Sequence, residues 1–207
     1  QMCIRDSLST VEIIAYGAEA MPQKVLKRLA KAFPNAQLQQ KFGTSETGAI
    51  RIKSIDNESL FFRIKDSDTK WKIVEEELWL KTPSRVVGYL NADDVGLEAD
   101  GWYRTGDLVE IDDHDNLRII GRASAVINVG GQKVHPSEVE AIIGEIEGIE
   151  AVNIYAMEAP VPGSAVACEI VVSGDEGSRV WKRIIRNHCR GKFCLLYTSP
   201  SPRDNSG

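Results

Sequence analysis

The sequence predicts a mixed fold, an α/β part followed by an α+β part, because the spacing of its apolar residues changes twice along the chain. Residues 11–16 are a short apolar, β-branched run that predicts a buried strand, and residues 22–33 repeat apolar side chains at helical spacing. A second strand is expected over residues 36–41. A strand, a helix and a strand in this order predict part of a parallel sheet.

The middle of the chain predicts a β-rich section made of short strands separated by polar turns. The last two of these strands flank Asp113, His114 and Asp115, so we expect them to form a hairpin. Strands at this spacing indicate a small barrel or an antiparallel sheet. The strands are expected over residues 60–64, 70–74, 77–81, 107–112 and 116–120.

After Gly121 the pattern changes again and predicts a small α+β unit. Ser137 and Glu140 have the spacing of a helix-capping pair at the start of its first helix. The elements of this unit are expected to be a helix over residues 136–146, strands over 151–157 and 165–172, and a helix over 178–190.

Composition excludes several classes of function. The chain has 207 residues, 43% of them hydrophobic, and a net charge of −5 with both signs interspersed, so a nucleic-acid surface is not expected. No apolar run approaches the roughly 20 residues that span a membrane, and no secretory signal is visible. The cysteines match no zinc spacing and predict free thiols in a cytoplasmic protein. They are Cys3, Cys168, Cys189 and Cys194.

The two ends differ from the rest of the chain in composition. Residues 1–7 have no periodicity, and residues 194–207 form a polar run rich in Ser and Pro. Both resemble translated adapter or assembly sequence, so we expect them to be non-native and exclude them from the fold. The alternative is a natural disordered tail.

Four local patterns stand in order along the chain. The second is a glycine-bounded loop whose hydroxyls and N–H groups suit a phosphate, whose carboxylate suits Mg²⁺, and whose aromatic ring suits a flat base. The third ends in an aspartate able to accept both ribose hydroxyls, and the fourth has two adjacent glycines where a chain can swing or a narrow ligand can pass. An ordinary turn or interdomain loop also explains each pattern alone. The patterns are Tyr16-Gly17-Ala18-Glu19, Phe42-Gly43-Thr44-Ser45-Glu46-Thr47-Gly48, Gly101-Trp102-Tyr103-Arg104-Thr105-Gly106-Asp107, and a run from Gly121-Arg122 to Glu138-Val139-Glu140.

Together, the order and spacing of these patterns resemble the adenylate-forming superfamily, which contains acyl-CoA synthetases, peptide-synthetase adenylation domains and beetle luciferases. The resemblance covers about residues 11–193, and its specific part is Thr105-Gly106-Asp107 followed by the Gly121-Arg122 run. It implies the end of a large α/β N-terminal domain, with a β-barrel-like subdomain, over residues 8–120. An incomplete small, mobile α+β C-terminal domain would occupy residues 121–193.

The resemblance implies an AMP-forming acid–thiol ligase that uses ATP, Mg²⁺ and CoA. In this family a carboxylate attacks the α-phosphate of ATP, giving an acyl-adenylate and pyrophosphate, and a thiol of CoA or of a carrier-protein arm then attacks the adenylate. The small domain rotates about a hinge between the two steps. Residues 128–134 are more similar to acyl-CoA synthetases than to peptide-synthetase adenylation domains. A peptide-synthetase-type adenylation domain, a non-catalytic nucleotide-binding module and an unrelated α/β protein are the alternatives.

The resemblance also implies a role for each matching residue. Gly17, Ala18 and Glu19 would line the adenine pocket, and Phe42 would replace a usual tyrosine against adenine. Gly43 would also bind the nucleotide, and Thr44 and Ser45 would contact the α-phosphate region. Glu46 would be the catalytic carboxylate that holds Mg²⁺, Asp107 would bind the ribose hydroxyls, and Arg122 would contact ribose or phosphate. Ser124 stands at the hinge position, and Gly130 and Gly131 would lie beside the pantetheine tunnel.

Two catalytic elements of the family are not found among these patterns. The family's phosphate loop lies upstream of the Tyr16 pattern, and its adenylation lysine lies near the end of the small domain. Lys192 follows a glycine but comes too early to be that lysine. We therefore expect the isolated chain to bind ATP weakly and to be inactive. The acid substrate and the oligomeric state are not predicted.

Other polar clusters are interpreted as structural. Residues 112–115 and residues 75–77 are expected to be solvated turns, and His135 is expected to be a loop residue. His188 and Cys189 are adjacent on a helix and point about 100° apart, which excludes a nucleophilic pair. The tryptophans are expected to pack in the core or at its edge. They are Trp71, Trp79, Trp102 and Trp181.

Overall fold

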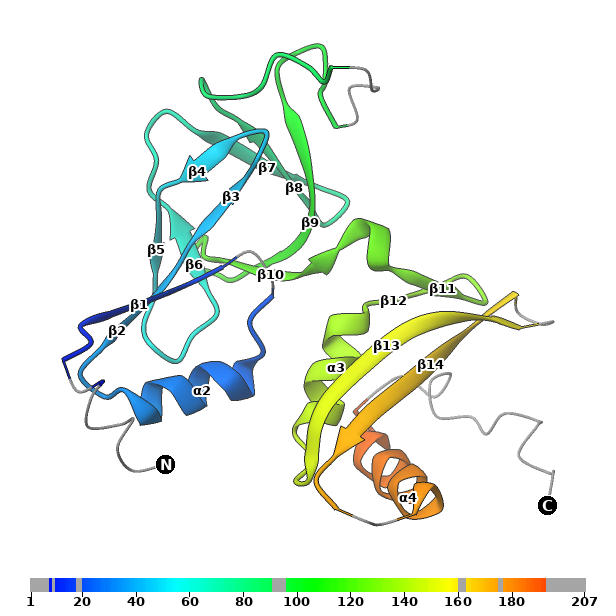
Figure 1. Cartoon of the computed structure of the whole chain (residues 1–207). Coiled ribbons are helices and arrows are strands. Elements are labelled where there is room, and N and C mark those ends of the chain that lie inside the picture. The colour runs from blue at the N-terminus through cyan, green and yellow to red at the C-terminus, as the bar shows by residue number, and fades with distance from the viewer. Residues whose placement is uncertain are drawn as a thin grey trace. The chain divides into compact units, whose positions relative to one another are not determined.

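The computed structural model describes residues 8, 10–17, 20–90, 96–159, 163–174 and 177–192. The chain divides into two compact units, Gln1–Ala125 and Val126–Gly207 (Figure 1). No helix in the described part of the chain has the length and apolarity that crossing a membrane requires.

The first unit begins with a small parallel sheet. Strand β1 (Ile13–Tyr16) pairs in parallel with β2 (Gln37–Gln40), and helix α2 (Gln23–Ala32) connects them. The helix follows Pro22 and buries Leu26 completely. The predicted strand–helix–strand segment with parallel pairing is therefore confirmed.

A curled six-stranded antiparallel sheet forms the rest of the first unit (Figure 1). Its strand order is β5-β6-β10-β9-β8-β7, so among the described residues β5 and β7 are its edges and the sheet does not close into a barrel. Of the two expected forms, a small barrel and an antiparallel sheet, the structure thus contains the antiparallel sheet. Its strands are β5 (Ile52–Ser54), β6 (Phe62–Ile64), β7 (Lys70–Val74), β8 (Glu77–Lys81), β9 (Tyr103–Ile111) and β10 (Leu117–Arg122).

A separate hairpin, β3 (Phe42–Thr44) with β4 (Gly48–Ile50), packs onto this sheet. Its Phe42 ring lies 5.6 Å from the ring of Phe62, measured between centroids. The hydrophobic core around this contact fixes the hairpin turn relative to the sheet. The buried members of this core are Phe42, Ile50, Phe62, Leu78, Leu80, Val109 and Leu117.

The turn between β7 and β8 has an unfavourable sequence for its backbone. Glu75 and Glu76 have φ angles of 50° and 70°. A two-residue hairpin turn with positive φ at both positions favours Asn-Gly, because a side chain in the left-handed region is strained. The next residue, Glu77, is buried and pairs with Arg104, so the prediction of a solvated turn is wrong for Glu77.

We expect Glu76→Gly to raise the free energy of unfolding by about 0.5–1 kcal/mol. Relief of left-handed strain gains roughly 1–2 kcal/mol, and the added freedom of glycine in the unfolded chain costs roughly 0.5–1 kcal/mol. Chemical denaturation measures the change. The control is Asp115→Gly, at φ 59°, where the gain should be smaller because aspartate tolerates this conformation. A loss of stability in Glu76→Gly contradicts the prediction.

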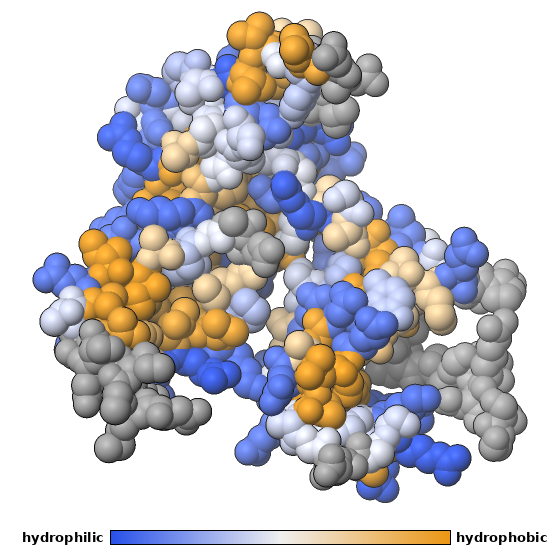
Figure 2. All heavy atoms as spheres, in the orientation of Figure 1, coloured by the Kyte–Doolittle hydropathy of each residue, from blue (hydrophilic) through white to orange (hydrophobic). Residues whose placement is uncertain are grey.

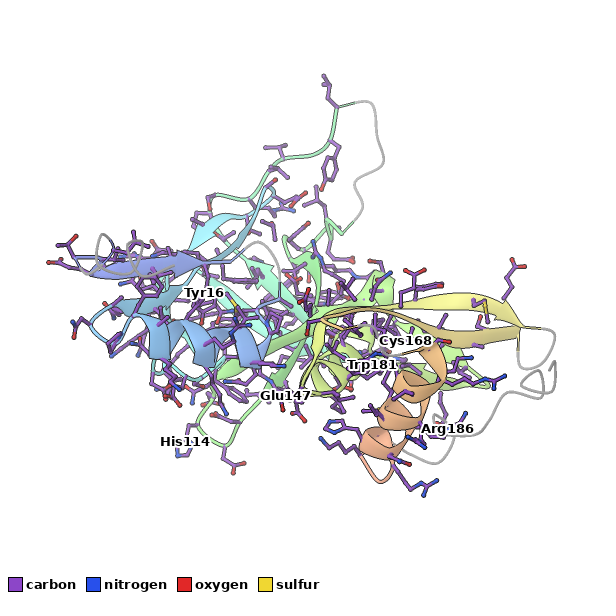
Figure 3. The ribbon with its side chains drawn as sticks, turned by 60° about the horizontal axis from the view of Figure 1, so that its bottom comes forward. Tyr16, His114, Glu147, Cys168, Trp181 and Arg186 are labelled. Carbon is purple, nitrogen blue, oxygen red and sulfur yellow. The ribbon has the colours of Figure 1, made fainter. Side chains whose placement is uncertain are left out.

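The second unit contains the two helices and two long strands that were expected, and also a short hairpin that was not. Helix α3 packs on β13 and against α4, and Trp181 lies in the core, as predicted (Figure 3). The elements are β11 (Ile127–Val129), β12 (Gln132–Val134), α3 (Pro136–Gly144), β13 (Ile149–Ala159), β14 (Gly163–Val172) and α4 (Ser178–Cys189).

The predicted capping pair at the start of α3 is wrong. The helix begins at Pro136 with His135 as the capping residue, so Ser137 lies inside the first turn. Glu140 instead accepts a hydrogen bond from the backbone N–H of Ile154 at 2.9 Å, which ties α3 to β13. The N–H group of a first helical residue has no acceptor within the helix, so proline loses no hydrogen bond there. This preference of Pro136 sets the start of the helix.

Candidate functional site

The turn of the β3–β4 hairpin is built by its own threonines. The hydroxyl of Thr44 accepts hydrogen bonds from the backbone N–H groups of Glu46 and Thr47, at 3.2 and 3.1 Å. Thr47 is fully buried, and Ser84 donates a hydrogen bond to its carbonyl at 2.7 Å. These contacts leave Ser45 exposed at the tip of a firmly held turn.

Gly43 is required by the close approach of the two hairpin strands. A Cβ atom at this position would lie 2.3 Å from the carbonyl oxygen of Gly48 and 2.9 Å from the Cα of Ala49. Both obstructing atoms belong to the backbone, so no side-chain rotation can make room. The packing of the hairpin therefore explains the glycine at this position without any ligand.

We expect Gly43→Ala to lower the free energy of unfolding by about 3 kcal/mol, the upper end of the usual cost of inserting an atom into a packed site. The control is Gly48→Ala in the same hairpin. There a Cβ atom would meet only Ser84 Oγ at 3.7 Å, and the cost of about 1–2 kcal/mol comes from φ alone, which is 71°. Chemical denaturation of both variants tests this order, and equal losses contradict it.

Glu46 presents a carboxylate that two tyrosines hold from the side. The hydroxyl of Tyr89 donates a hydrogen bond to Glu46 Oε1 at 2.6 Å, and this bond lowers the pKa of Glu46, with Tyr103 adding to the effect. Burial, followed by the contact with Glu46, raises the pKa of the Tyr103 hydroxyl, so it remains a donor. The backbone N–H of Val86 donates to the carbonyl of Glu46 at 2.8 Å. The carboxylate is therefore ionised and fixed.

The loop that carries Tyr89 is apolar and exposed. Val87 and Leu90 are 98% and 91% exposed, and Figure 2 shows apolar atoms on the surface of the first unit. Sequence reasoning assigned no role to Tyr89 or Tyr103. Tyr103 lies within the Gly101–Asp107 pattern, and this position could have marked it as a site residue.

Asp107 and Arg122 form the second part of the site. They are direct partners in the antiparallel register of β9 and β10, so their side chains lie on the same face of the sheet. Arg122 Nη1 lies 3.0 Å from Asp107 Oδ1 and donates to the carbonyl of Thr105 at 2.6 Å. Burial raises the pKa of Asp107, and Arg122 opposes this shift. The pair thus offers a recessed carboxylate beside an exposed guanidinium.

Strand β9 links the two parts of the site. Its residues Tyr103 and Asp107 are four positions apart. Tyr103 reaches Glu46, and Asp107 reaches Arg122. The structure therefore brings two carboxylates from distant patterns, Glu46 and Asp107, to one strand of one unit.

Three other predicted residues of the first unit occupy structural positions. A Cβ atom at Gly17 would lie 2.5 Å from the carbonyl oxygen of Lys41, so glycine permits the ends of β1 and β2 to approach. Phe42 is only 7% exposed, and its packing on Phe62 accounts for it without a ligand. Ala18 and Glu19 lie outside the described residues. Ser124 lies in a short 3₁₀ turn, Ala123–Ala125, at the end of the unit.

Gly130 and Gly131 belong to the second unit and form the two-residue turn of the β11–β12 hairpin. Their φ angles are 57° and 85°, which is the backbone of a turn that glycine favours. A Cβ atom at Gly131 would meet nothing within 4 Å, so the turn lies in open space. The turn explains both glycines and leaves their surface accessible.

The predicted turn at residues 112–115 is confirmed as a hydrogen-bonded turn. Asp112 accepts hydrogen bonds from the backbone N–H groups of His114 and Asn116, both at 2.9 Å, and His114 lies at the outer tip of the turn (Figure 3). The described residues contain no group of three His, Cys, Asp or Glu side chains suited to a metal. Within those ranges, Cys168 and Cys189 are free, as predicted, while Cys3 and Cys194 lie outside them.

Comparison with known proteins finds sequence relatives among CoA ligases and a shared fold among solved structures. No protein-family profile matches the chain. It is 33% identical over 150 residues to 2-succinylbenzoate–CoA ligase of Listeria innocua, covering 68% of this chain and 32% of that protein. It is 28% identical over 190 residues to 4-coumarate–CoA ligase 1 of Arabidopsis thaliana, covering 81% of this chain and 34% of that protein.

Among solved structures, an amide bond synthetase from Marinactinospora thermotolerans shares the fold, with a TM-score of 0.78 and 20% identity over 92% of this chain and 42% of that one. The chain spans about a third of the length of the two curated relatives described above.

Proposed function

We propose that this chain, which belongs to the adenylate-forming (AMP-binding) superfamily, is part of an ATP-dependent acid–CoA ligase. The complete ligase would convert a small carboxylic acid, ATP and CoA into an acyl-CoA, AMP and pyrophosphate. The observation that carries the proposal is the pair of fixed carboxylates, Glu46 and Asp107, linked by strand β9. The names of the curated relatives favour CoA as the acceptor.

Asp107 suits the ribose of ATP. A carboxylate can accept hydrogen bonds from two neighbouring hydroxyls, and Asp107 is recessed so that its partner must come to it. Arg122 neutralises its charge on one side and leaves the other carboxylate oxygen to the ligand. The half-exposed guanidinium of Arg122 would also contact ribose or phosphate.

Glu46 suits Mg²⁺ bound to the phosphates. Carboxylate oxygens are preferred ligands of this ion, and the lowered pKa of Glu46 keeps the carboxylate charged. When bound, Mg²⁺ would neutralise phosphate charge during attack at the α-phosphate. Tyr89 and Tyr103 would keep Glu46 aimed, and Thr44 and Ser45 would lie near the α-phosphate.

The remaining roles complete the proposal. Gly17, Ala18, Glu19, Phe42 and Gly43 would form the adenine side of the site. The second unit would be the small α+β domain of the family, and Ser124 would act as its hinge, since it stands one residue before the boundary residue Ala125. Gly130 and Gly131 would border the path of the pantetheine arm, because their hairpin turn carries no side chain to obstruct it.

The experiment uses the protein encoded by the complete reading frame that contains this chain. It is incubated with ATP, Mg²⁺, CoA and a panel of aromatic and aliphatic acids, and AMP and acyl-CoA are measured by chromatography. Equal amounts of AMP and acyl-CoA support the proposal. Adenylate formation without transfer to CoA would instead support a carrier-protein acceptor, and no adenylate with any acid would support a nucleotide-binding module.

A further inference from the structure

We propose that Glu77 is a positioning residue that sets the backbone of Gly106 and Asp107 and so places the Asp107 carboxylate. This inference rests on the proposed function, in which Asp107 binds the ribose. It goes beyond that function because Glu77 lies outside all four sequence patterns and touches no proposed ligand group.

Both carboxylate oxygens of Glu77 are engaged in the β9 strand. Oε1 accepts a hydrogen bond from the backbone N–H of Gly106 at 2.9 Å. Oε2 accepts from Nε and Nη2 of Arg104, at 3.3 and 3.2 Å. Glu77 is only 8% exposed, so these bonds compete with little water.

These bonds occur where the pairing of β8 with β9 slips. Trp79 is paired with Arg104, and Glu77 is paired with Leu108, so a step of two residues along β8 matches a step of four residues along β9. Strand β9 therefore carries two extra residues in a bulge that contains Asp107. Bulges redirect side chains and are frequent beside active sites. Here the backbone changes direction at Gly106, whose φ angle is 71°.

Side chains hold the bulge. Thr105 Oγ1 donates a hydrogen bond to the carbonyl of Leu78 at 2.7 Å and accepts one from the N–H of Asp107 at 3.1 Å. Together with the bond from Gly106 to Glu77, this satisfies two successive N–H groups, those of Gly106 and Asp107. An ordinary sheet would use backbone carbonyls for this purpose, and the bulge has replaced them with Thr105 and Glu77.

The charge of Glu77 has a second, separable effect. The charged groups that face Asp107 are Arg122 from β10 and Glu77 from β8, while Arg104 of β9 engages Glu77. Burial and then Glu77 raise the pKa of Asp107, and Arg122 lowers it. Asp107 accepts ribose hydroxyls best as a carboxylate, so nucleotide affinity should fall as the pH drops through this raised pKa. Removing the charge of Glu77 should move that loss of affinity to lower pH.

The test compares Glu77→Gln, which keeps an acceptor for Gly106, with Glu77→Ala, which removes it. In the complete ligase we expect Glu77→Ala to raise the KM for ATP roughly tenfold, the value of one hydrogen bond, and to leave the KM for the acid unchanged. Glu77→Gln should keep the KM for ATP near wild type at neutral pH and shift the acid limb of kcat/KM for ATP to lower pH. The control is Glu110→Gln, which removes a half-buried ion pair with Arg118 at 2.7 Å.

A second readout does not depend on activity. Hydrogen exchange of the Gly106 amide, followed by NMR in the chain of 207 residues, should be faster in Glu77→Ala and near wild type in Glu77→Gln. Unchanged exchange in Glu77→Ala overturns the positioning role. Equal rises in the KM values for ATP and for the acid also overturn it, because they indicate general disruption. Absence of AMP formation by the wild-type enzyme overturns the proposed function instead.

Discussion

Replacement of Asp107 by asparagine is expected to lower kcat/KM for ATP in the complete ligase by roughly 10²–10⁴-fold. Two hydrogen bonds from ribose hydroxyls to a carboxylate contribute about 1.5–3 kcal/mol each, and asparagine offers one neutral acceptor in their place. The loss should appear in the KM for ATP more than in the KM for CoA, because only ATP carries the contacted ribose in the first step. Steady-state kinetics with each substrate varied in turn measures the change.

Deoxynucleotides separate this role from a loss of folding. The wild-type enzyme should discriminate strongly between ATP and its 2′-deoxy and 3′-deoxy forms, and Asp107→Asn should discriminate weakly, because its contacts to both hydroxyls are already impaired. Asp113→Asn, in the exposed turn between β9 and β10, is the control for loss of a carboxylate elsewhere. Discrimination that survives unchanged in Asp107→Asn contradicts the assignment.

Replacement of Glu46 by glutamine is expected to lower kcat roughly 10²–10³-fold, the usual effect of removing one electrostatic contact to a developing charge. Glutamine retains an oxygen that can accept the hydrogen bond of Tyr89, so the hairpin should keep its fold. What is lost is the negative charge, which the lowered pKa of Glu46 maintains at neutral pH. A Mg²⁺ titration of activity should show half-saturation at a higher concentration in Glu46→Gln.

Tyr89→Phe provides the matched comparison. It removes the bond of 2.6 Å to Glu46 and leaves the carboxylate in place, so its effect on kcat should be about tenfold, close to the value of one hydrogen bond. A Mg²⁺ dependence that is identical in wild type and Glu46→Gln would exclude Glu46 as the metal ligand. Thermal denaturation of both variants shows whether the fold is retained.

Much of the fold was predictable because its longer elements carry a clear period. Strands β7 and β8 have the same bounds as the strands expected over residues 70–74 and 77–81. Helix α4 covers nearly the whole range expected for it. The unpredicted strands β3, β4, β5, β11 and β12 have three residues each, which is too short for alternation to be distinguished from a turn.

Part of the candidate site lies within the sequence patterns, and part depends on contacts between distant residues that no pattern shows. The order of the patterns pointed to Glu46 and Asp107, and the structure joins them through β9. Glu77 was misjudged because three consecutive glutamates resemble a solvated turn, and its partner Arg104 is 27 residues away. Thr44 has a turn-forming role that sequence reasoning did not assign, since its hydroxyl accepts two N–H groups of its own turn.

Transfer of an oxygen isotope distinguishes activation of the acid by joining it to AMP from other ways of activating it. An acid labelled with ¹⁸O in its carboxyl group is incubated with the complete ligase, ATP, Mg²⁺ and CoA, and the nucleotide product is examined by mass spectrometry. Attack of the carboxylate on the α-phosphate followed by attack of the thiol on the carbonyl leaves one carboxylate oxygen on AMP. We expect AMP that carries ¹⁸O, whereas AMP without label, or ADP with labelled phosphate, would exclude activation of the acid as its adenylate.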